Sequence, residues 1–395
     1  MKHTDVVILS AVRTPIGEFG GGLKDVPAAQ LGAVAARAAL ERGGLSPENV
    51  DEVVFGCARQ AGNGPNPARQ VAWHTGVPVD RPAYTINKAC ASGMKAVTLG
   101  VQSILTDENG VVLAGGIEQM SQIPYLMMKA RWGYRLGDDT LVDAMYRDGY
   151  LCPLAEMVMG ETAELLADRY GITRAEQDAF ALESQRKAVA AWESGAFADE
   201  VVSMEVPGPK GTTVVVGRDE RLRPTTSLEK LAKLRPVFRT GGTITAGNAS
   251  GIADGAAAMV LTSVERASAL GTQPLARVVG FASGAVHPRE MGLGPIPATH
   301  RLLAQTGLSL ADFELIELNE AFAVQVLAVE HELKWNVERR NIHGGAVALG
   351  HPTGCSGARI LVTLIHALRT HGRTLGLATL CVSGGLGMAI AVELT

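Results

Sequence analysis

Short apolar runs alternate with amphipathic stretches along most of this chain, a pattern typical of an α/β protein. An alanine-rich stretch over residues 28–42, ended by Gly43 and Gly44, predicts a helix, and Thr173 with Glu176 forms the capping box of another helix that ends before Gly195. Because helical stretches separate the apolar runs, we expect a largely parallel sheet with helices on both faces. The runs that predict buried strands are 6–9, 53–56, 110–116, 256–262, 276–282, 315–318 and 375–381.

The pattern of the first part of the chain starts again at about residue 275. The run at 276–282 resembles the first strand, 375–381 resembles 111–116, and the segment that leads a helix at Cys355 matches the one at Cys90. Between them the composition changes, first to clustered Met and Tyr and then to Gly, Pro and charge. Two copies of one α/β unit explain this order, although chance similarity of such units is the alternative. We expect an N-terminal half (1–120 plus 251–272), an inserted domain (121–250) and a C-terminal half (273–395).

Composition excludes several classes of function. The chain has 395 residues, 47% of them apolar, with 46 glycines and 5% aromatic residues, as in tightly packed α/β enzymes. A net charge of −4 without long runs of one sign argues against binding to nucleic acid or a membrane surface. The N-terminal apolar run is too short for a signal peptide, and no uninterrupted apolar stretch could span a membrane. Five scattered cysteines do not form a disulfide pattern, so we expect a reducing cytoplasm.

Cys90 is the first candidate for chemistry, because it lies between a predicted strand and a helix whose apolar face carries Met94, Val97 and Val101. The positive end of a helix dipole and free N–H groups would lower the pKa of this thiol from about 8.5 and make it nucleophilic. Simple packing of a buried cysteine is the alternative. The glycines at 17–22 lack the G-x-G-x-x-G spacing of a dinucleotide site. The histidines lack metal-ligand spacing and no C-x-x-C occurs, so we predict no catalytic metal.

Taken together, several motifs resemble those of the thiolases over nearly the whole chain. Each motif alone is a weak signal, but their order makes the set specific. They are Arg13-Thr14-Pro15, the Cys90 segment, Gly115-Gly-Ile-Glu-Gln-Met-Ser121, Gly247-Asn-Ala-Ser-Gly251, Asn319-Glu-Ala-Phe322, Gly350-His351-Pro-Thr-Gly354 and Cys381-Val-Ser-Gly-Gly385.

The resemblance implies a five-layer α-β-α-β-α body and a CoA-dependent acyltransferase. In this family a cysteine at the position of Cys90 attacks a thioester or ketone carbonyl, and His351 would accept its proton. Cys381 would be the second acid/base. His351 and a water held by Asn319 would form one oxyanion hole, and backbone N–H groups of Cys90 and Ser383 would form the other. The reaction is thiolysis of a 3-ketoacyl-CoA, or the reverse Claisen condensation.

The resemblance also implies a CoA site, with CoA and acyl-CoA as substrates and no tightly bound cofactor. Arg223 would lie near the adenine, Ser250 would meet the pantetheine, and Met159 and Phe322 would line the tunnel. Ala246, Gly247 and Met291 occupy matching positions. Family members form dimers or tetramers, so we expect a homodimer or homotetramer.

Three positions depart from the family pattern. Ser383 replaces a usual glycine, which could strain an oxyanion hole that needs positive φ. His343 replaces a frequent asparagine. Val158 replaces the histidine of short-chain members, which favours a degradative thiolase with a broad chain-length range over an acetyl-CoA acetyltransferase that forms acetoacetyl-CoA. A ketosynthase-type enzyme would not need Cys381, and a silent thiolase-fold subunit would have lost Cys90, His351 or Cys381.

Overall fold

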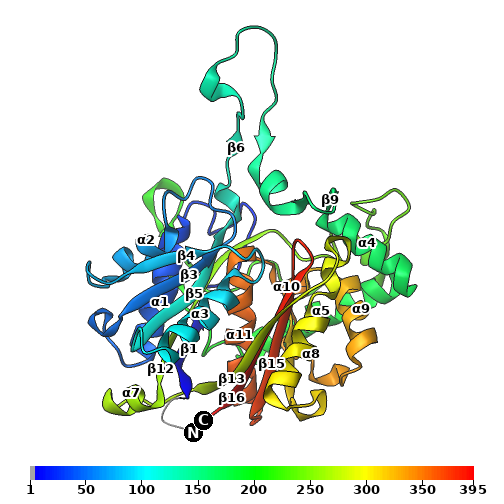
Figure 1. The fold of residues 1–395 in the computed structure, drawn as a ribbon. Coiled ribbons are helices and arrows are strands. Elements are labelled where there is room, and N and C mark those ends of the chain that lie inside the picture. The colour runs from blue at the N-terminus through cyan, green and yellow to red at the C-terminus, as the bar shows by residue number, and fades with distance from the viewer. Residues whose placement is uncertain (1–4) are drawn as a thin grey trace.

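The computed structural model describes residues 5–395, so the first four residues of the predicted N-terminal half lie outside it. Two sheet regions alternate with three layers of helices, and the N-terminal half (blue to cyan) lies beside the C-terminal half (yellow to red) in Figure 1. The predicted five-layer α-β-α-β-α body is therefore confirmed.

A ten-stranded mixed sheet runs through both halves in the order β14-β15-β16-β13-β1-β12-β5-β3-β4, with β2 paired to β12. The two halves meet where β1 pairs with β13 over only two residue pairs. The strands are β1 (Val6–Arg13), β2 (Gly17–Glu18), β3 (Glu52–Cys57), β4 (Ala83–Ile86), β5 (Val111–Gln119), β12 (Ala253–Ser263), β13 (Ala276–Ala285), β14 (Leu315–Leu318), β15 (Leu375–Val382) and β16 (Leu386–Leu394).

The expectation of a largely parallel sheet is wrong. Parallel pairing joins β3 to β4, β3 to β5, and β14 to β15, whereas the other neighbours are antiparallel. The short turn 383–385 between β15 and β16 permits only a hairpin, because a parallel neighbour needs a long crossover. Likewise, β12 returns from the inserted segment antiparallel to both β1 and β5.

Helices cover both outer faces and fill the space between the sheet regions. The predicted helix at 28–42 and the predicted capping box at Thr173 are both confirmed. The outer layers contain α1 (Ala28–Arg42) and α2 (Pro67–Thr75) on the N-terminal side and α8 (Pro295–Thr306) and α9 (Ala323–Leu333) on the C-terminal side. The middle layer consists of α3 (Ser92–Leu105) and α11 (Thr353–Thr370), which pack against each other.

Small residues let the two middle helices approach closely. A Cβ atom on Gly93 of α3 would lie 2.9 Å from Cβ and N of Ala358 on α11. One large buried apolar cluster accordingly contains residues of α3, α11 and the strands of both halves. Because the cores of the two halves are continuous, the N-terminal ends of α3 and α11 are held beside each other.

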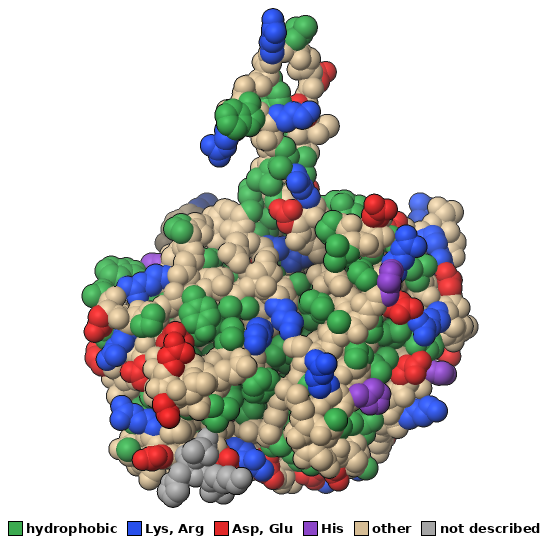
Figure 2. All heavy atoms as spheres, viewed as in Figure 1, with side chains coloured by type: hydrophobic (Ala, Val, Ile, Leu, Met, Phe, Trp, Pro, Cys, Tyr) green, Lys and Arg blue, Asp and Glu red, His purple; other side chains and the backbone are tan. Residues whose placement is uncertain are grey.

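The inserted segment carries a long arm and a smaller lobe. The arm, residues 125–143, projects from the body between β6 (Tyr125–Leu126) and β7 (Val142–Asp143), as Figures 1 and 2 show. The lobe and remaining short elements are η4 (Tyr146–Tyr150, a π-helical turn), β8 (Leu151–Cys152), β9 (Met157–Val158), α4 (Met159–Tyr170), α5 (Arg174–Glu193), β10 (Met204–Pro207), β11 (Thr213–Val216), α6 (Leu228–Ala232), α7 (Val264–Ala269) and α10 (Ala346–Leu349). No helix within residues 5–395 is long and apolar enough to cross a membrane.

Candidate active site

A cavity of about 940 Å³ is formed jointly by the two halves and the inserted segment. Most of the predicted site residues line it. They are Cys90, Met159, Ala246, Ser250, Met291, Phe322, His351, Cys381 and Ser383. Asn319, Gly247 and Arg223 are absent from its wall.

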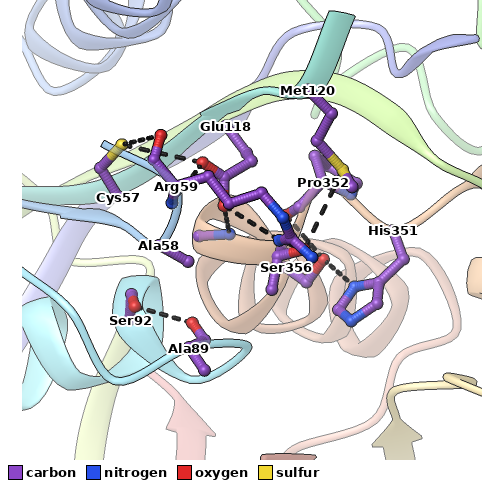
Figure 3. A network of polar contacts seen from close by, with 12 residues as sticks. Cys57, Ala58, Arg59, Ala89, Ser92, Glu118, Met120, His351, Pro352 and Ser356 are labelled. Carbon is purple, nitrogen blue, oxygen red and sulfur yellow. Dashed lines mark hydrogen bonds and ion pairs between the residues drawn. The ribbon is translucent and has the colours of Figure 1, made fainter. Parts of the chain in front are cut away.

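Cys90 lies in the loop between β4 and α3, and its neighbours hold this loop in an unusual conformation. Ala89 has a φ of 44°, in the left-handed region that non-glycine residues rarely adopt. The hydroxyl of Ser92 donates to the Ala89 carbonyl at 2.7 Å and accepts the Lys88 N–H at 2.8 Å (Figure 3). These bonds fix the backbone on both sides of the thiol at the start of α3.

The local field on Cys90 differs from the sequence-based expectation. Burial raises the pKa of the thiol, while the Arg59 charge and the backbone N–H groups of Ser383 and Cys90 lower it, and the net direction is upward. The expected net lowering by the helix N-terminus is therefore wrong, because desolvation disfavours the thiolate more than these groups favour it. Cys90 needs a base to become a nucleophile.

His351 lies between α10 and α11 and is held as a neutral base. Its Nδ1 lies 2.5 Å from the Ser356 hydroxyl oxygen, which itself lies 2.9 Å from the Pro352 carbonyl oxygen (Figure 3). A carbonyl can only accept, so both contacts are satisfied when Ser356 donates to Pro352 and accepts from Nδ1–H. The lone pair then lies on Nε2. Burial, with smaller effects of Arg59 and Arg359, lowers the pKa of His351 to about 3.

Cys381 is the penultimate residue of β15 and is fully buried. Burial and the negative charge of a Cys90 thiolate raise its pKa, so the two thiols are coupled. Ser383 lies at the following turn, and its backbone N–H contributes to lowering the pKa of Cys90. Among the described residues, the positive φ values in this turn belong to Gly384 and Gly385 and not to Ser383. The serine side chain therefore causes no backbone strain there.

Asn319 lies behind the cavity wall at the end of β14. It is fully buried, and neither its amide nitrogen nor its amide oxygen has a hydrogen-bond partner among residues 5–395. Next to it, the Glu320 carboxylate accepts the Val347 N–H at 3.1 Å and the Ser184 hydroxyl at 2.7 Å. Glu320 thereby anchors α10, the helix that precedes His351.

His343 packs away from the cavity. Its Nε2 lies 3.2 Å from His371 Nε2, and its ring contacts the edge of Phe197. The substitution of His for the family's frequent Asn therefore changes the packing at the C-terminal end of α11 rather than the cavity wall.

The predicted adenine contact Arg223 lies on the surface. It is about half exposed and pairs with Glu18 at 2.7 Å. Arg221, two residues earlier, lines the cavity instead, which the sequence reading did not find. Gly247 faces Leu231 and Leu234, and a Cβ there would lie 2.6 Å from each of them.

Three further polar residues were missed, of which Arg59 lines the cavity while Glu118 and Ser356 lie behind its wall. Arg59 follows β3, Glu118 lies near the end of β5, and the two form an ion pair at 3.7 Å (Figure 3). Both lie at carboxyl ends of parallel strands, where ligand sites of open sheets form, so their positions carried a usable signal. Ser356 gave no such signal, because its contact with His351 depends on the turn at the start of α11.

Comparison with known proteins places this geometry in a family. The thiolase N-terminal domain model matches residues 6–265, and the thiolase C-terminal domain model matches residues 272–394. An acetyl-CoA acetyltransferase of Pseudomonas aeruginosa is 51% identical over 388 residues (98% of this chain, 99% of that protein). A probable acetyl-CoA acyltransferase of Staphylococcus aureus is 49% identical over 390 residues (99% of each).

Solved structures of similar proteins have the same fold as this chain. The Bacillus anthracis acetyl-CoA acetyltransferase superposes with a TM-score of 0.97 at 45% identity, covering 99% of each chain. Human mitochondrial 3-ketoacyl-CoA thiolase superposes with a TM-score of 0.97 at 43% identity, covering 100% of each. A structure of human mitochondrial 3-ketoacyl-CoA thiolase in complex with CoA superposes with a TM-score of 0.95 at 43% identity, covering 99% of this chain and 98% of that one.

The fold and these matches define an acyltransferase built from an N-terminal and a C-terminal thiolase domain. The chain belongs to the thiolase family, whose reaction is CoA-dependent thiolysis of a 3-ketoacyl-CoA and the reverse condensation.

Proposed function

We propose that this thiolase works through an acyl–Cys90 intermediate. The observation that carries the proposal is that Cys90, His351 and Cys381 line one buried cavity. Neutral His351 takes the Cys90 proton at Nε2, and the sulfur attacks the 3-keto carbonyl. The C2–C3 bond then breaks, and Cys381 protonates the departing acetyl-CoA enolate. Attack by CoA on the acyl–Cys90 thioester releases the shortened acyl-CoA.

Two oxyanion holes serve these steps in the proposal. The N–H groups of Cys90 and Ser383 are assigned to the carbonyl oxygen bound at Cys90, and the lowering effect of both N–H groups on the pKa of Cys90 supports this assignment. The second hole uses His351 and a water on Asn319. The unpartnered buried amide of Asn319 supports this role, because such a group requires a hydrogen-bond partner.

CoA is assigned to the mouth of the cavity as a substrate, without a resident cofactor. Ser250, Ala246 and Met159, all from the inserted segment, line the cavity there and support a CoA-binding role for residues 121–250. Met291 and Phe322 supply apolar wall from the C-terminal half (273–395). We replace Arg223 with Arg221 as the cation nearest the CoA path, and we retain Gly247 only as a packing position.

Degradative thiolysis over a broad range of chain lengths is the function we favour. Val158 lines the cavity as an apolar residue, where a histidine would mark a short-chain enzyme. The second candidate is an acetyl-CoA acetyltransferase restricted to acetoacetyl-CoA. It is favoured by the name of the Pseudomonas aeruginosa relative, an acetyl-CoA acetyltransferase.

Thiolysis assays with acetoacetyl-CoA and a medium-chain 3-ketoacyl-CoA distinguish the two candidates. Comparable kcat/KM values support the degradative enzyme. A preference of 100-fold or more for acetoacetyl-CoA, about 2.7 kcal/mol of transition-state discrimination, supports the acetyltransferase. Cys90→Ala should abolish both activities, whereas Cys152→Ala, a buried thiol outside the cavity wall, should keep them. Activity that survives Cys90→Ala would overturn the mechanism.

We further propose a cytoplasmic homo-oligomer. All five cysteines are free thiols, which suits a reducing compartment. The arm projects from the body (Figure 2). On it, Trp132 is 88% exposed and Leu136 is 98% exposed, and apolar side chains so exposed favour burial against another copy. Analytical ultracentrifugation should show a dimer or tetramer that dissociates when residues 127–141 are replaced by a short Gly-Ser linker. A monomeric full-length protein would refute this assembly.

A further inference from the structure

Arg59 places a positive charge in the wall of the cavity, whose other charged residues are Glu18, Asp148, Glu161 and Arg221. The side chain is only 5% exposed and comes from the loop after β3. One guanidinium nitrogen donates to the Thr353 hydroxyl, while Nε has no hydrogen-bond partner in the described part of the chain. Burying an arginine without hydrogen bonds to its N–H groups costs free energy, so a buried guanidinium with an unpaired N–H is stabilised by an added acceptor.

The nearby carboxylate does not fully satisfy Arg59. Glu118 lies 3.7 Å from Nη1, beyond hydrogen-bond distance. Its two oxygens instead accept backbone N–H groups, from Arg59 at 3.0 Å and from Gly354 at 2.8 Å. Glu118 is therefore engaged in joining the end of β5 to the loop after β3 and the start of α11, and the guanidinium keeps unused donor capacity.

The inserted segment holds the guanidinium in place. Tyr150 covers it at 5.1 Å from the ring centroid, and Gly149 packs against it so closely that a Cβ there would collide with the guanidinium. Both residues also line the cavity. Arg59 is thus fixed between the main body and the turn Tyr146–Tyr150.

Arg59 is close to the reacting groups. Its side chain extends toward Ser356 and His351 in Figure 3, and its charge acts on both Cys90 and His351. An acyl group bound to Cys90 must share the cavity with this charge. A carboxylate at the end of that acyl group could accept two parallel N–H hydrogen bonds from a planar guanidinium.

We propose that Arg59 is a specificity-determining residue that binds a terminal carboxylate, so that the preferred substrates are 3-ketoacyl-CoA thioesters of dicarboxylic acids. The inference rests on the proposed thiolase function. The bonds made and broken are those of ordinary thiolysis: the C3–sulfur bond to Cys90 forms, the C2–C3 bond breaks, and CoA releases an ω-carboxyacyl-CoA. Arg59 would hold the carboxylate of the acyl group through both half-reactions.

Matched substrate pairs test the proposal. Each pair contains a 3-ketoacyl-CoA that ends in a carboxylate and one of equal length that ends in a methyl group, with six or eight carbons. We expect at least a tenfold higher kcat/KM for the carboxylate in at least one pair. Arg59→Leu should lower the ratio of kcat/KM for the carboxylate substrate to kcat/KM for the methyl substrate at least tenfold, and Arg59→Lys should lower it less. Arg147 is an exposed arginine in the turn Tyr146–Tyr150, and Arg147→Leu should leave this ratio unchanged.

A wild-type measurement guards against failure of the variants to fold. Succinyl-CoA should acylate Cys90 faster than butyryl-CoA, as followed by intact-protein mass spectrometry. No carboxylate preference in either substrate pair, or a ratio unaffected by Arg59→Leu, would overturn the proposal while leaving the thiolase function intact. Loss of thiolysis for acetoacetyl-CoA and for all other substrates would instead refute the proposed function itself.

Discussion

Replacing Ser356 with alanine removes the one side chain that holds the His351 ring in its basic form. Ser356 lies on the first turn of α11, outside the cavity wall, and accepts from His351 Nδ1–H at 2.5 Å. Without it, either Nδ1–H remains buried and unpaired, or the proton moves to Nε2 and removes the lone pair that should receive the Cys90 proton.

The magnitude follows from the cost of an unsatisfied buried donor. Such a group costs about 1–3 kcal/mol, and a factor of ten in rate corresponds to about 1.4 kcal/mol. We therefore expect Ser356→Ala to lower kcat for thiolysis by roughly 5- to 150-fold. KM should change little, because the hydroxyl is buried behind the imidazole and is not part of the cavity wall.

Two assays separate this effect from a loss of structure. Steady-state thiolysis of acetoacetyl-CoA gives kcat and KM, and alkylation of Cys90 by iodoacetamide reports how readily the thiolate forms. Thr98→Val is the matched control, because it deletes another buried hydroxyl that bonds within a middle-layer helix, at 3.0 Å to the Lys95 carbonyl, away from the cavity. It should keep full activity.

A kcat within twofold of wild type for Ser356→Ala would refute the assigned role of Ser356 in selecting the tautomer. Equal losses in Ser356→Ala and Thr98→Val would refute it as well, because the effect would then reflect packing of the middle helices rather than the state of His351.

Three further predictions follow from the buried groups. Cys381→Ala should still be acylated at Cys90 by acetyl-CoA yet lose thiolysis and condensation, as seen by mass spectrometry together with steady-state assays; unchanged turnover would exclude Cys381 as the acid/base. Burial raises the pKa of Asp254 from 3.8 to about 6, so its contribution to stability is fully present below pH 3.8 and falls by about 3 kcal/mol as the pH rises through 6. In urea titrations between pH 4 and 7, Asp254→Asn should remove the decrease of the unfolding free energy that Asp254 causes as the pH rises. A variant whose unfolding free energy depends on pH as in the wild type would contradict this assignment. Gly93→Ala should lower the unfolding free energy by about 1–3 kcal/mol, since its Cβ would press on Ala358, and an unshifted urea midpoint would show that the middle layer can relax.

Local sequence patterns were sufficient for much of the fold. The helix at 28–42 and the capping box at Thr173 depend on periodicity and on bonds within one turn, which a single stretch of chain determines. The two-copy α/β architecture also follows from the order of such stretches. Strand direction does not, because the pairing of β12 with β1 and β5 joins segments more than a hundred residues apart.

For the site, too, some properties follow from the sequence and others only from the tertiary structure. Residue type and motif predicted Cys90, His351 and Cys381 as reactive groups, and the structure places all three in the wall of one cavity. The net direction of the Cys90 pKa required the tertiary structure, because desolvation depends on everything packed around the sulfur and outweighed the local effect of the helix. Sequence by itself determined the chemical groups and most of the local structure. Only the tertiary structure decided their protonation, brought Arg59 and Ser356 to them, and placed Arg221 rather than Arg223 at the cavity, since burial and contact are properties of the whole fold.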